Sequence, residues 1–226
     1  MLFLLILVPA IDLTVSGWFY VPGADFIWRG PAIPEFIHES IQVLARVVAV
    51  ALSLGWLIAL FRSYRSGQPC TFLTLGRRDW LFLVLAMALG PGLVANALLK
   101  DHWGRARPHQ IEEFGGTRHH SPPLVITNQC EQNCSFVAGD AAVGFYVHAL
   151  AYVVRRRSGV ILATGLGVGA LAGLLRIGMG GHFFSDVIYA GVFMVLTIAA
   201  LHAVMYGGRQ TAALWRGWTP WLHRNA

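Results

Sequence analysis

Apolar residues gather in six stretches of the chain, each close to the length that a helix needs to cross a bilayer. The stretches cover residues 1–20, 43–61, 80–99, 136–154, 159–175 and 187–206. A membrane-spanning helix needs about 20 mainly apolar residues. The pattern therefore predicts an all-α polytopic membrane protein, built as a six-transmembrane-helix bundle. The first stretch is the weakest candidate because Asp12 lies inside it, and the fifth stretch is short.

The composition agrees with a membrane protein. Of the 226 residues, 56% are hydrophobic and only 12% are charged, whereas soluble domains carry about 25% charged residues. We predict a single membrane-embedded domain over residues 1–226, with a long outer loop at residues 100–135. The N-terminal stretch lacks the basic flank and small-residue cleavage site of a signal peptide, so we expect it to be retained as the first span.

The positions of the arginines predict the orientation of the chain. They gather between the second and third stretches, between the fourth and fifth, and after the sixth: Arg62, Arg65, Arg77, Arg78, Arg155, Arg156, Arg157, Arg209, Arg216 and Arg224. Basic connections stay on the cytoplasmic side of a membrane. We therefore expect both termini to be cytoplasmic. The formal net charge of +6 fits anionic lipid headgroups, and the sequence has no motif for nucleic acid.

Residues 176–186, which read R-I-G-M-G-G-H-F-F-S-D, place ionisable side chains between two apolar stretches. Such residues at membrane depth are costly and usually functional. His182 and Asp186 are four residues apart and would share one face of a helix. A carboxylate can hold one ring N–H and leave the other nitrogen free to attack. We predict this role for the pair, although an ordinary contact at a helix end explains the spacing equally well.

A second cluster follows the third apolar stretch and contains Lys100, Arg105 and Arg107. It lies on the predicted outer face, where the preference for cytoplasmic basic residues does not explain three cations. An anionic ligand does explain them, because arginine binds phosphate oxygens in pairs and lysine adds a point charge. We expect Lys100 and Arg107 to bind a phosphate, with Arg105 and His102 as possible accessory residues.

A third cluster, residues 134–140, opens the fourth apolar stretch. Ser135 is expected to be the N-cap of the helix. The backbone amides of Ala138 and Gly139 would then lie in its first turn, which is a favourable site for an anion. Together with Arg176 and the cations of the second cluster, these groups suit phosphoryl transfer, in which fixed positive charges stabilise the equatorial oxygens. We expect one active site at the outer membrane–water boundary.

The spacings K-x6-R-P (Lys100, Arg107) and R-x5-H-x3-D (Arg176, His182, Asp186) resemble the first and third signatures of the type-2 phosphatidic acid phosphatase superfamily. The resemblance implies a metal-independent enzyme without a cofactor. In it, the histidine matching His182 forms a phosphohistidine that water hydrolyses, the aspartate matching Asp186 orients that histidine, and the three cations hold the phosphate.

The resemblance also implies a bacterial inner-membrane protein whose site faces the periplasm and whose partners are the bilayer and a lipid phosphate. Small bacterial members act on lipid A phosphate, phosphatidylglycerol phosphate or undecaprenyl pyrophosphate. The C-x3-C-S-F and F-G-G features resemble the lipid A phosphatase type most. The oligomeric state stays open.

The second family signature, P-S-G-H, is replaced by V-A-G-D at residues 137–140. Ala138 removes a hydroxyl group, so the chain could be an impaired variant. Asp140 stands where the family has its general acid, and nearby cations disfavour a protonated carboxyl group. Asp140 could instead orient water or pair with a cation. The proton could then come from a neighbouring histidine, for which the candidates are His102, His109, His119 and His120.

Three other functions compete with hydrolysis. A phosphotransferase would pass the phosphate from one lipid to another, and a non-catalytic binder would fit the changes at Ala138 and Asp140. A metal site would combine His119, His120, His182 and Asp186, but this spacing fits no known pattern, so we predict no metal.

The cysteines give one further prediction. Cys130 and Cys134 lie in the predicted outer loop, where disulfides persist, whereas Cys70 lies on the reducing side. We expect a Cys130–Cys134 disulfide and a free Cys70.

Overall fold

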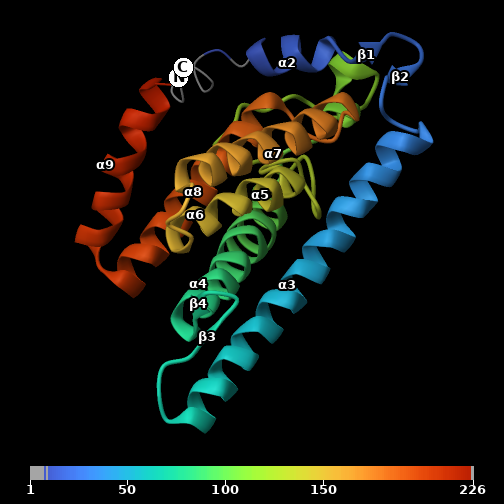
Figure 1. Cartoon of the computed structure of the whole chain (residues 1–226). Helices are drawn as coiled ribbons and strands as arrows, with labels where there is room; N and C mark the ends of the chain where they lie inside the picture. Colours follow the sequence, from blue (N-terminus) through green and yellow to red (C-terminus); the bar gives the residue numbers. More distant parts are fainter. Residues whose placement is uncertain (1–7, 9, 225–226) are drawn as a thin grey trace.

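The computed structural model describes residue 8 and residues 10–224, and helices make up most of it (Figure 1). The helices are α2 (Ala10–Gly17), α3 (Ala32–Ser66), α4 (Arg77–Met87), η1 (Ala88–Lys100), η2 (Pro108–Gln110), η3 (Glu112–Phe114), α5 (Gly139–Tyr146), η4 (Val147–Ala149), α6 (Leu150–Val153), α7 (Ser158–Gly178), α8 (Phe184–Tyr206) and α9 (Gly208–Arg224). Two short antiparallel hairpins pair β1 (Tyr20–Val21) with β2 (Asp25–Phe26) and β3 (Thr71–Phe72) with β4 (Leu75–Gly76).

In the described part of the chain, four helices are long and apolar enough to cross a membrane. They are α3, the continuous pair α4–η1, α7 and α8, and they correspond to the second, third, fifth and sixth predicted stretches. The predicted fourth span is divided among α5, η4 and α6, because a 3-10 turn interrupts it. Most of the predicted first span lies outside the described residues or in the eight-residue helix α2. The mostly helical architecture is confirmed, whereas the count of six spans stays a prediction.

Helix α3 is much longer than its apolar stretch predicts. It has 35 residues and begins at Ala32 rather than near residue 43. At 1.5 Å per residue such a helix is about 50 Å long, against about 30 Å for a hydrocarbon core. In Figure 1, α3 runs along the outside of the other helices. Its first turns therefore extend past the apolar stretch, toward the end of the bundle where α5 begins.

The third predicted span changes its helix type around the sequence G-P-G at residues 90–92. From Ala88 onward the helix widens into the π-type helix η1, with Pro91 inside it. Proline removes one backbone donor and clashes with the preceding turn, which disturbs regular α-helical bonding. The Asn96 side chain donates to the Pro91 carbonyl group at 2.7 Å. The widened helix ends at Lys100, one of the predicted phosphate-binding residues.

Glycines hold α5 and η4 against α7. A methyl group at Gly144 would lie 2.7 Å from the Cα of Gly169, and one at Gly165 would lie 2.4 Å from the backbone nitrogen of His148. These distances allow no side chain, and small residues at such positions let helix backbones approach closely. The close contact sets the start of α5, with Asp140, beside the end of α7, with Arg176.

Candidate active site

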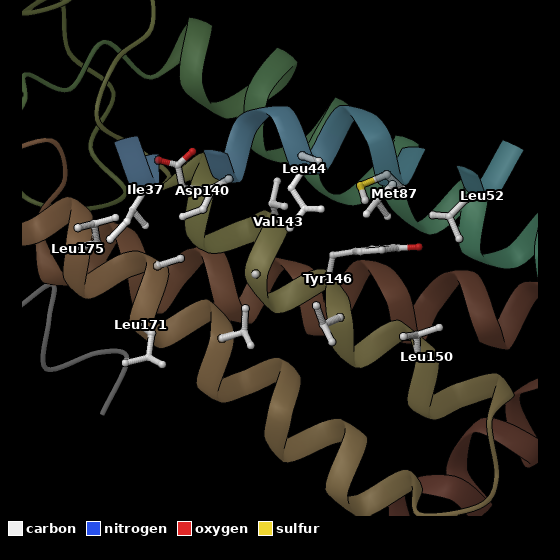
Figure 2. A pocket seen from close by; sticks show the side chains of 17 residues that line it. Ile37, Leu44, Leu52, Met87, Asp140, Val143, Tyr146, Leu150, Leu171 and Leu175 are labelled. Carbon is white, nitrogen blue, oxygen red and sulfur yellow. The ribbon is translucent and has the colours of Figure 1, made fainter. Parts of the chain in front are cut away.

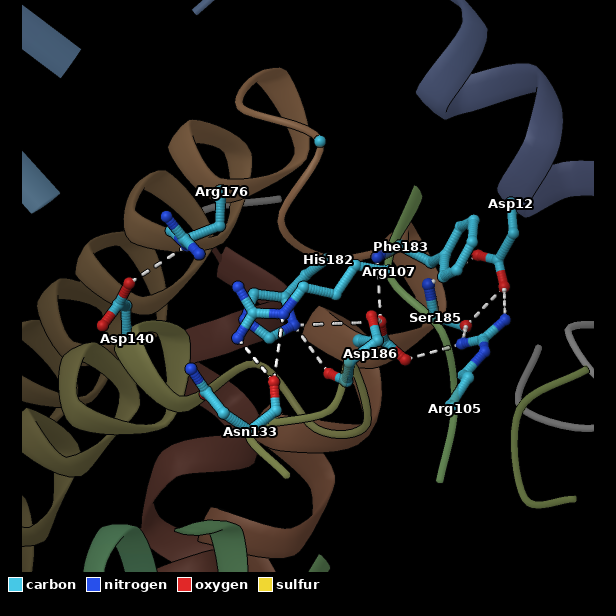
Figure 3. A network of polar contacts seen from close by, with 12 residues as sticks. Asp12, Arg105, Arg107, Asn133, Asp140, Arg176, His182, Phe183, Ser185 and Asp186 are labelled. Atoms are coloured by element: carbon cyan, nitrogen blue, oxygen red, sulfur yellow. Dashed lines mark hydrogen bonds and ion pairs between the residues drawn. The ribbon is translucent and has the colours of Figure 1, made fainter. Parts of the chain in front are cut away.

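Four segments of the chain bring their polar residues to one end of the bundle, and Figure 3 shows Asp140, Arg176 and His182 among them. Lys100 ends η1, Asp140 lies in the first turn of α5, Arg176 lies in the last turn of α7, and His182 lies just before α8. The basic connections after α3, α6 and α8 lie at the opposite ends of these helices. The structure therefore assembles residues far apart in sequence into one polar site.

His182 is the central residue of this site. Its side chain is 2% exposed, and its Nδ1 lies 2.6 Å from the backbone carbonyl oxygen of Ser135. A carbonyl oxygen only accepts hydrogen bonds, so Nδ1 carries the proton and Nε2 keeps its lone pair. Burial, followed by the charges of Arg176, Arg107 and Lys100, holds the pKa of His182 well below its usual value, against the carbonyl contact. The imidazole is therefore neutral at neutral pH, which is the state required of a nucleophile.

Asp186 contacts His182 less directly than the sequence predicts. Its Oδ2 lies 3.9 Å from His182 Nδ1, and His182 precedes helix α8, so the two residues do not share a helical face. Oδ2 instead accepts from the Ser135 hydroxyl at 2.5 Å and from the Phe183 backbone N–H at 2.9 Å. Asp186 is the third residue of α8 and caps its own helix. Its hydrogen-bonded connection to His182 therefore runs through Ser135.

The start of α5 also differs from the prediction. Its N-cap residue is Ala138 rather than Ser135, and the Ala138 N–H donates to the backbone oxygen of Asp186 at 3.3 Å. Gly139 is the first helical residue, so its N–H has no acceptor within the helix. A methyl group at Gly139 would lie 3.5 Å from Lys100 Nζ. Of the two predicted amides, that of Gly139 remains for a ligand.

Arg105 is a structural residue rather than an accessory phosphate ligand. Its side chain is fully buried, and it donates to Asp186 at 2.6 Å, to Asp12 at 2.8 Å, and to the Ser185 hydroxyl and the Ser121 carbonyl at 2.9 Å. Asp12 also accepts from the Ser185 backbone N–H at 2.8 Å. We call Asp12, Arg105, Ser185 and Asp186 the buried ion network. It explains why an aspartate interrupts the first apolar stretch.

Arg107 and Arg176 point into the site with fewer internal partners. Arg107 donates through Nε and Nη2 to the Asn133 carbonyl at 3.1 and 2.7 Å. Burial and then Arg176 lower its pKa to about 10, against the opposing charge of Asp140, so Arg107 stays charged at neutral pH. Arg176 Nε lies 3.2 Å from Asp140 Oδ2. We call Lys100, Arg107, Arg176 and Asp140 the phosphate pocket, after the ligand that the sequence predicts for them. Three cations face one carboxylate there, which favours a dianion.

The four histidines proposed as proton donors beside Asp140 lie elsewhere in the described chain. His102 contacts the carbonyls of Ala97 and Leu98, His109 lies 2.8 Å from the Gly180 carbonyl, exposed His119 pairs with Glu112, and His120 packs against the Phe183 ring. No three metal-ligating side chains converge among the described residues.

The histidine beside Asp140 is His38, which sequence analysis missed. Its Nδ1 lies 2.8 Å from Asp140 Oδ2. The residue was overlooked because the apolar pattern places the start of the second span after it, although the helix begins at Ala32. One available signal was the polar pair His38 and Gln42, whose four-residue spacing places them on one face of a helix.

An apolar groove leads away from Asp140 between α3, α5 and α7 (Figure 2). Its volume is about 560 Å³. Ile37 and Asp140 lie near one end, and Leu52 and Leu150 lie near the other. A smaller pocket of about 270 Å³ adjoins it and includes Lys100, Asn96 and Gln42. The site is therefore polar at the cations and apolar along the helices.

The predicted disulfide between Cys130 and Cys134 is present, and Cys70 is free, as expected. The bridged segment contains Asn133, whose carbonyl group accepts both hydrogen bonds from Arg107. The disulfide therefore constrains the backbone that positions one of the pocket cations.

Comparison with known proteins agrees with the motifs. The sequence matches the PAP2 superfamily over residues 79–209. It is 35% identical over 201 residues to a lipid A 4'-phosphatase of Francisella tularensis subsp. novicida (strain U112), covering 88% of this chain and 87% of the relative. It is 34% identical over 210 residues to a lipid A 4'-phosphatase of Rhizobium leguminosarum, covering 87% of this chain and 88% of that relative. No solved structure matches significantly. The chain belongs to the PAP2 superfamily.

Proposed function

We propose that this chain hydrolyses a phosphate monoester on a membrane lipid of the lipid A type, without a metal ion. The observation that carries the proposal is a neutral, buried His182 surrounded by the excess positive charge of Lys100, Arg107 and Arg176. A dianionic phosphate would neutralise that excess. Fixed cations around a reacting phosphoryl group stabilise the charge on its equatorial oxygens and cost no reorganisation during the reaction.

The reaction then proceeds in two steps. His182 Nε2 attacks phosphorus, and the bond to the lipid oxygen breaks, which leaves a phosphohistidine and a lipid alcohol. Water next attacks phosphorus, the P–N bond breaks, and inorganic phosphate leaves. The Ser135 carbonyl holds the Nδ1 proton throughout, so Nε2 remains the reacting nitrogen. Asp186 and Ser135 keep the ring in place.

Two observations support a lipid A phosphate as the substrate. Two relatives that align with nearly the whole chain are named lipid A 4'-phosphatase. The apolar groove beside Asp140 has room for part of an acyl chain while the phosphate lies on the cations. A substrate of this kind would enter sideways from the bilayer, between α3 and α7.

The orientation follows from the basic connections, which we propose to be cytoplasmic. The site lies at the opposite end of the helices and would face the periplasm of a bacterial inner membrane. Both termini would then be cytoplasmic, with the chain forming one membrane-embedded domain.

The proposal is tested by phosphate release from lipid A in detergent with EDTA present, using the wild-type chain and His182→Ala. Wild type should turn over in EDTA. His182→Ala should lose activity by on the order of 10⁵-fold, as expected for a nucleophile. Glu39→Gln, an exposed change on α3, is the matched control and should behave as wild type.

Several outcomes would contradict parts of the proposal. Loss of activity in EDTA with recovery on adding metal would exclude the metal-independent mechanism. Transfer of the phosphate to a second lipid supplied as acceptor, in place of its release as inorganic phosphate, would indicate a phosphotransferase. Binding of lipid A without turnover would indicate a non-catalytic binder. Turnover of phosphatidylglycerol phosphate or undecaprenyl pyrophosphate in preference to lipid A would change the substrate.

A further inference from the structure

Asp140 holds a histidine from a helix that carries none of the motif residues. His38 Nδ1 lies 2.8 Å from Asp140 Oδ2, and the two side chains are 19% and 10% exposed. The two atoms lie within ion-pairing distance, but they lack the alignment of a hydrogen bond. Asp140 also lies 3.2 Å from Arg176. The imidazole is therefore fixed at the edge of the phosphate pocket while part of its ring remains accessible.

The neighbours of His38 on α3 place it where the two halves of the site meet. Ile37 and Ile41 line the apolar groove together with Asp140. Gln42, one turn further along, lines the smaller pocket together with Lys100 and Asp140. A lipid whose phosphate lies on the cations and whose chain enters the groove must pass its ester oxygen across this junction. That oxygen is the one that leaves when the phosphate is transferred.

The reaction needs a proton at this position, and three other groups of the site are poorly suited to give it. An alkoxide is a poor leaving group, so a general acid accelerates its departure by about 10²–10⁴-fold. His182 is used as the nucleophile. Arg107, with a pKa of about 10, holds its proton too tightly to exchange it at neutral pH. Asp140 is surrounded by positive partners that favour its charged form. An imidazole can both give and take a proton near neutral pH.

On the basis of the function proposed above, we infer that His38 is the proton donor and acceptor of the reaction, held in position by Asp140. In the first step the P–O bond breaks, and the ring N–H of protonated His38 gives its proton to the leaving oxygen, which forms the lipid alcohol. In the second step neutral His38 takes a proton from water as the water oxygen attacks phosphorus. The P–N bond breaks, His182 and inorganic phosphate are released, and His38 is protonated again.

The test compares four full-length chains in detergent with lipid A as the substrate: wild type, His38→Ala, Asp140→Asn and the double variant. His38→Ala should lower kcat by about 10²–10³-fold, the range of general acid–base catalysis, with little change in KM. Added imidazole should restore part of the activity, because the pocket beside His38 is open to small molecules. Since the two residues act as one unit, the double variant should be no slower than His38→Ala alone.

A second substitution and a matched control guard against a folding defect. His38→Gln keeps a polar group of similar size and should show the same loss of kcat. Glu39→Gln changes the adjacent residue of α3. It should retain the wild-type kcat and the wild-type elution volume in size-exclusion chromatography, which reports a folding defect.

The outcomes separate this inference from the proposed function. If His182→Ala is inactive and both His38 variants keep most of the wild-type kcat, the role of His38 is wrong and the hydrolase proposal stands. A loss in His38→Ala that imidazole does not relieve, and that adds fully to the loss in Asp140→Asn, makes His38 structural and also overturns the inference. A wild-type chain that releases no phosphate from lipid A overturns both.

Discussion

Arg105 and Arg107 are two residues apart in the same loop, yet the charges that surround them have opposite signs in excess. Arg105 is fully buried in the buried ion network, where its charge faces the two carboxylates Asp12 and Asp186. Arg107 lies in the phosphate pocket, where three cations face the single carboxylate Asp140. The first region already satisfies the donors of its arginine. The second has a positive excess that a ligand would balance.

This difference shows how to separate a structural arginine from a binding one. A buried charge is stable only with partners that compensate for its lost hydration. Arg105 obtains these partners from α2, α8 and the loop itself, so a ligand would have nothing to add. Arg107 uses Nε and Nη2 on one carbonyl group. The remaining capacity of its guanidinium group matches a phosphate oxygen.

Removing Arg105 should produce the largest loss of stability. Arg105→Met would leave Asp12 and Asp186 buried without their cation, and breaking a buried pair costs about 3–5 kcal/mol. The free energy of unfolding in detergent measures this loss, with exposed Arg62→Met as the control. A stable variant with lost activity would place Arg105 in the phosphate pocket instead.

Removing Arg107 should affect catalysis rather than folding. Arg107→Met should lower kcat/KM on lipid A by about 10²-fold, as for other single donors to a developing charge. The free energy of unfolding of this variant should differ from that of wild type by less than about 1 kcal/mol. The Arg107 side chain is only half-buried, and its partner is a carbonyl group. Steady-state kinetics and unfolding of the same preparation provide the comparison. Equal losses of stability in the Arg105 and Arg107 variants would remove the distinction between the two regions.

Breaking the disulfide should weaken the phosphate pocket and leave the buried ion network intact. Cys130→Ser with Cys134→Ser opens a loop of about five residues, which corresponds to about 2 kcal/mol in the chain-entropy model. Because Asn133 lies inside that loop and anchors Arg107, KM for lipid A should rise several-fold. Cys70→Ser should change neither the free energy of unfolding nor KM for lipid A. An unchanged KM would show that the loop does not position Arg107.

The smallest effect is expected at Ala138, which joins the two regions. Its N–H donates to the backbone carbonyl oxygen of Asp186, and it caps α5 without a side-chain hydrogen bond. Ala138→Ser would supply a capping oxygen, worth about 1 kcal/mol, and should preserve or raise turnover. Thermal unfolding and phosphate release test both effects. Reduced turnover with raised stability would indicate that the alanine is required for the reaction.

Local patterns predicted which residues gather at one end of the bundle, but not the contacts that each of them makes. Lys100, Arg107, Arg176 and His182 stand at motif spacings, and the structure brings them together. The sequence assigned Arg105 to the ligand, whereas the structure gives it buried partners. It also missed His38, because a helix that extends past its apolar stretch leaves no signal in the hydrophobic pattern.

By itself, the sequence determined which segments are apolar, where charged residues interrupt them and which cysteines can pair. These properties depend on the free energy of transferring each segment into lipid and on short-range geometry, both of which act over a few neighbouring residues. Only the tertiary structure decided which donors are already satisfied. The partner of Arg105 lies 93 residues away at Asp12, and that of Asp140 lies on α3. Such pairs form only when helix packing brings separate segments within a few ångströms.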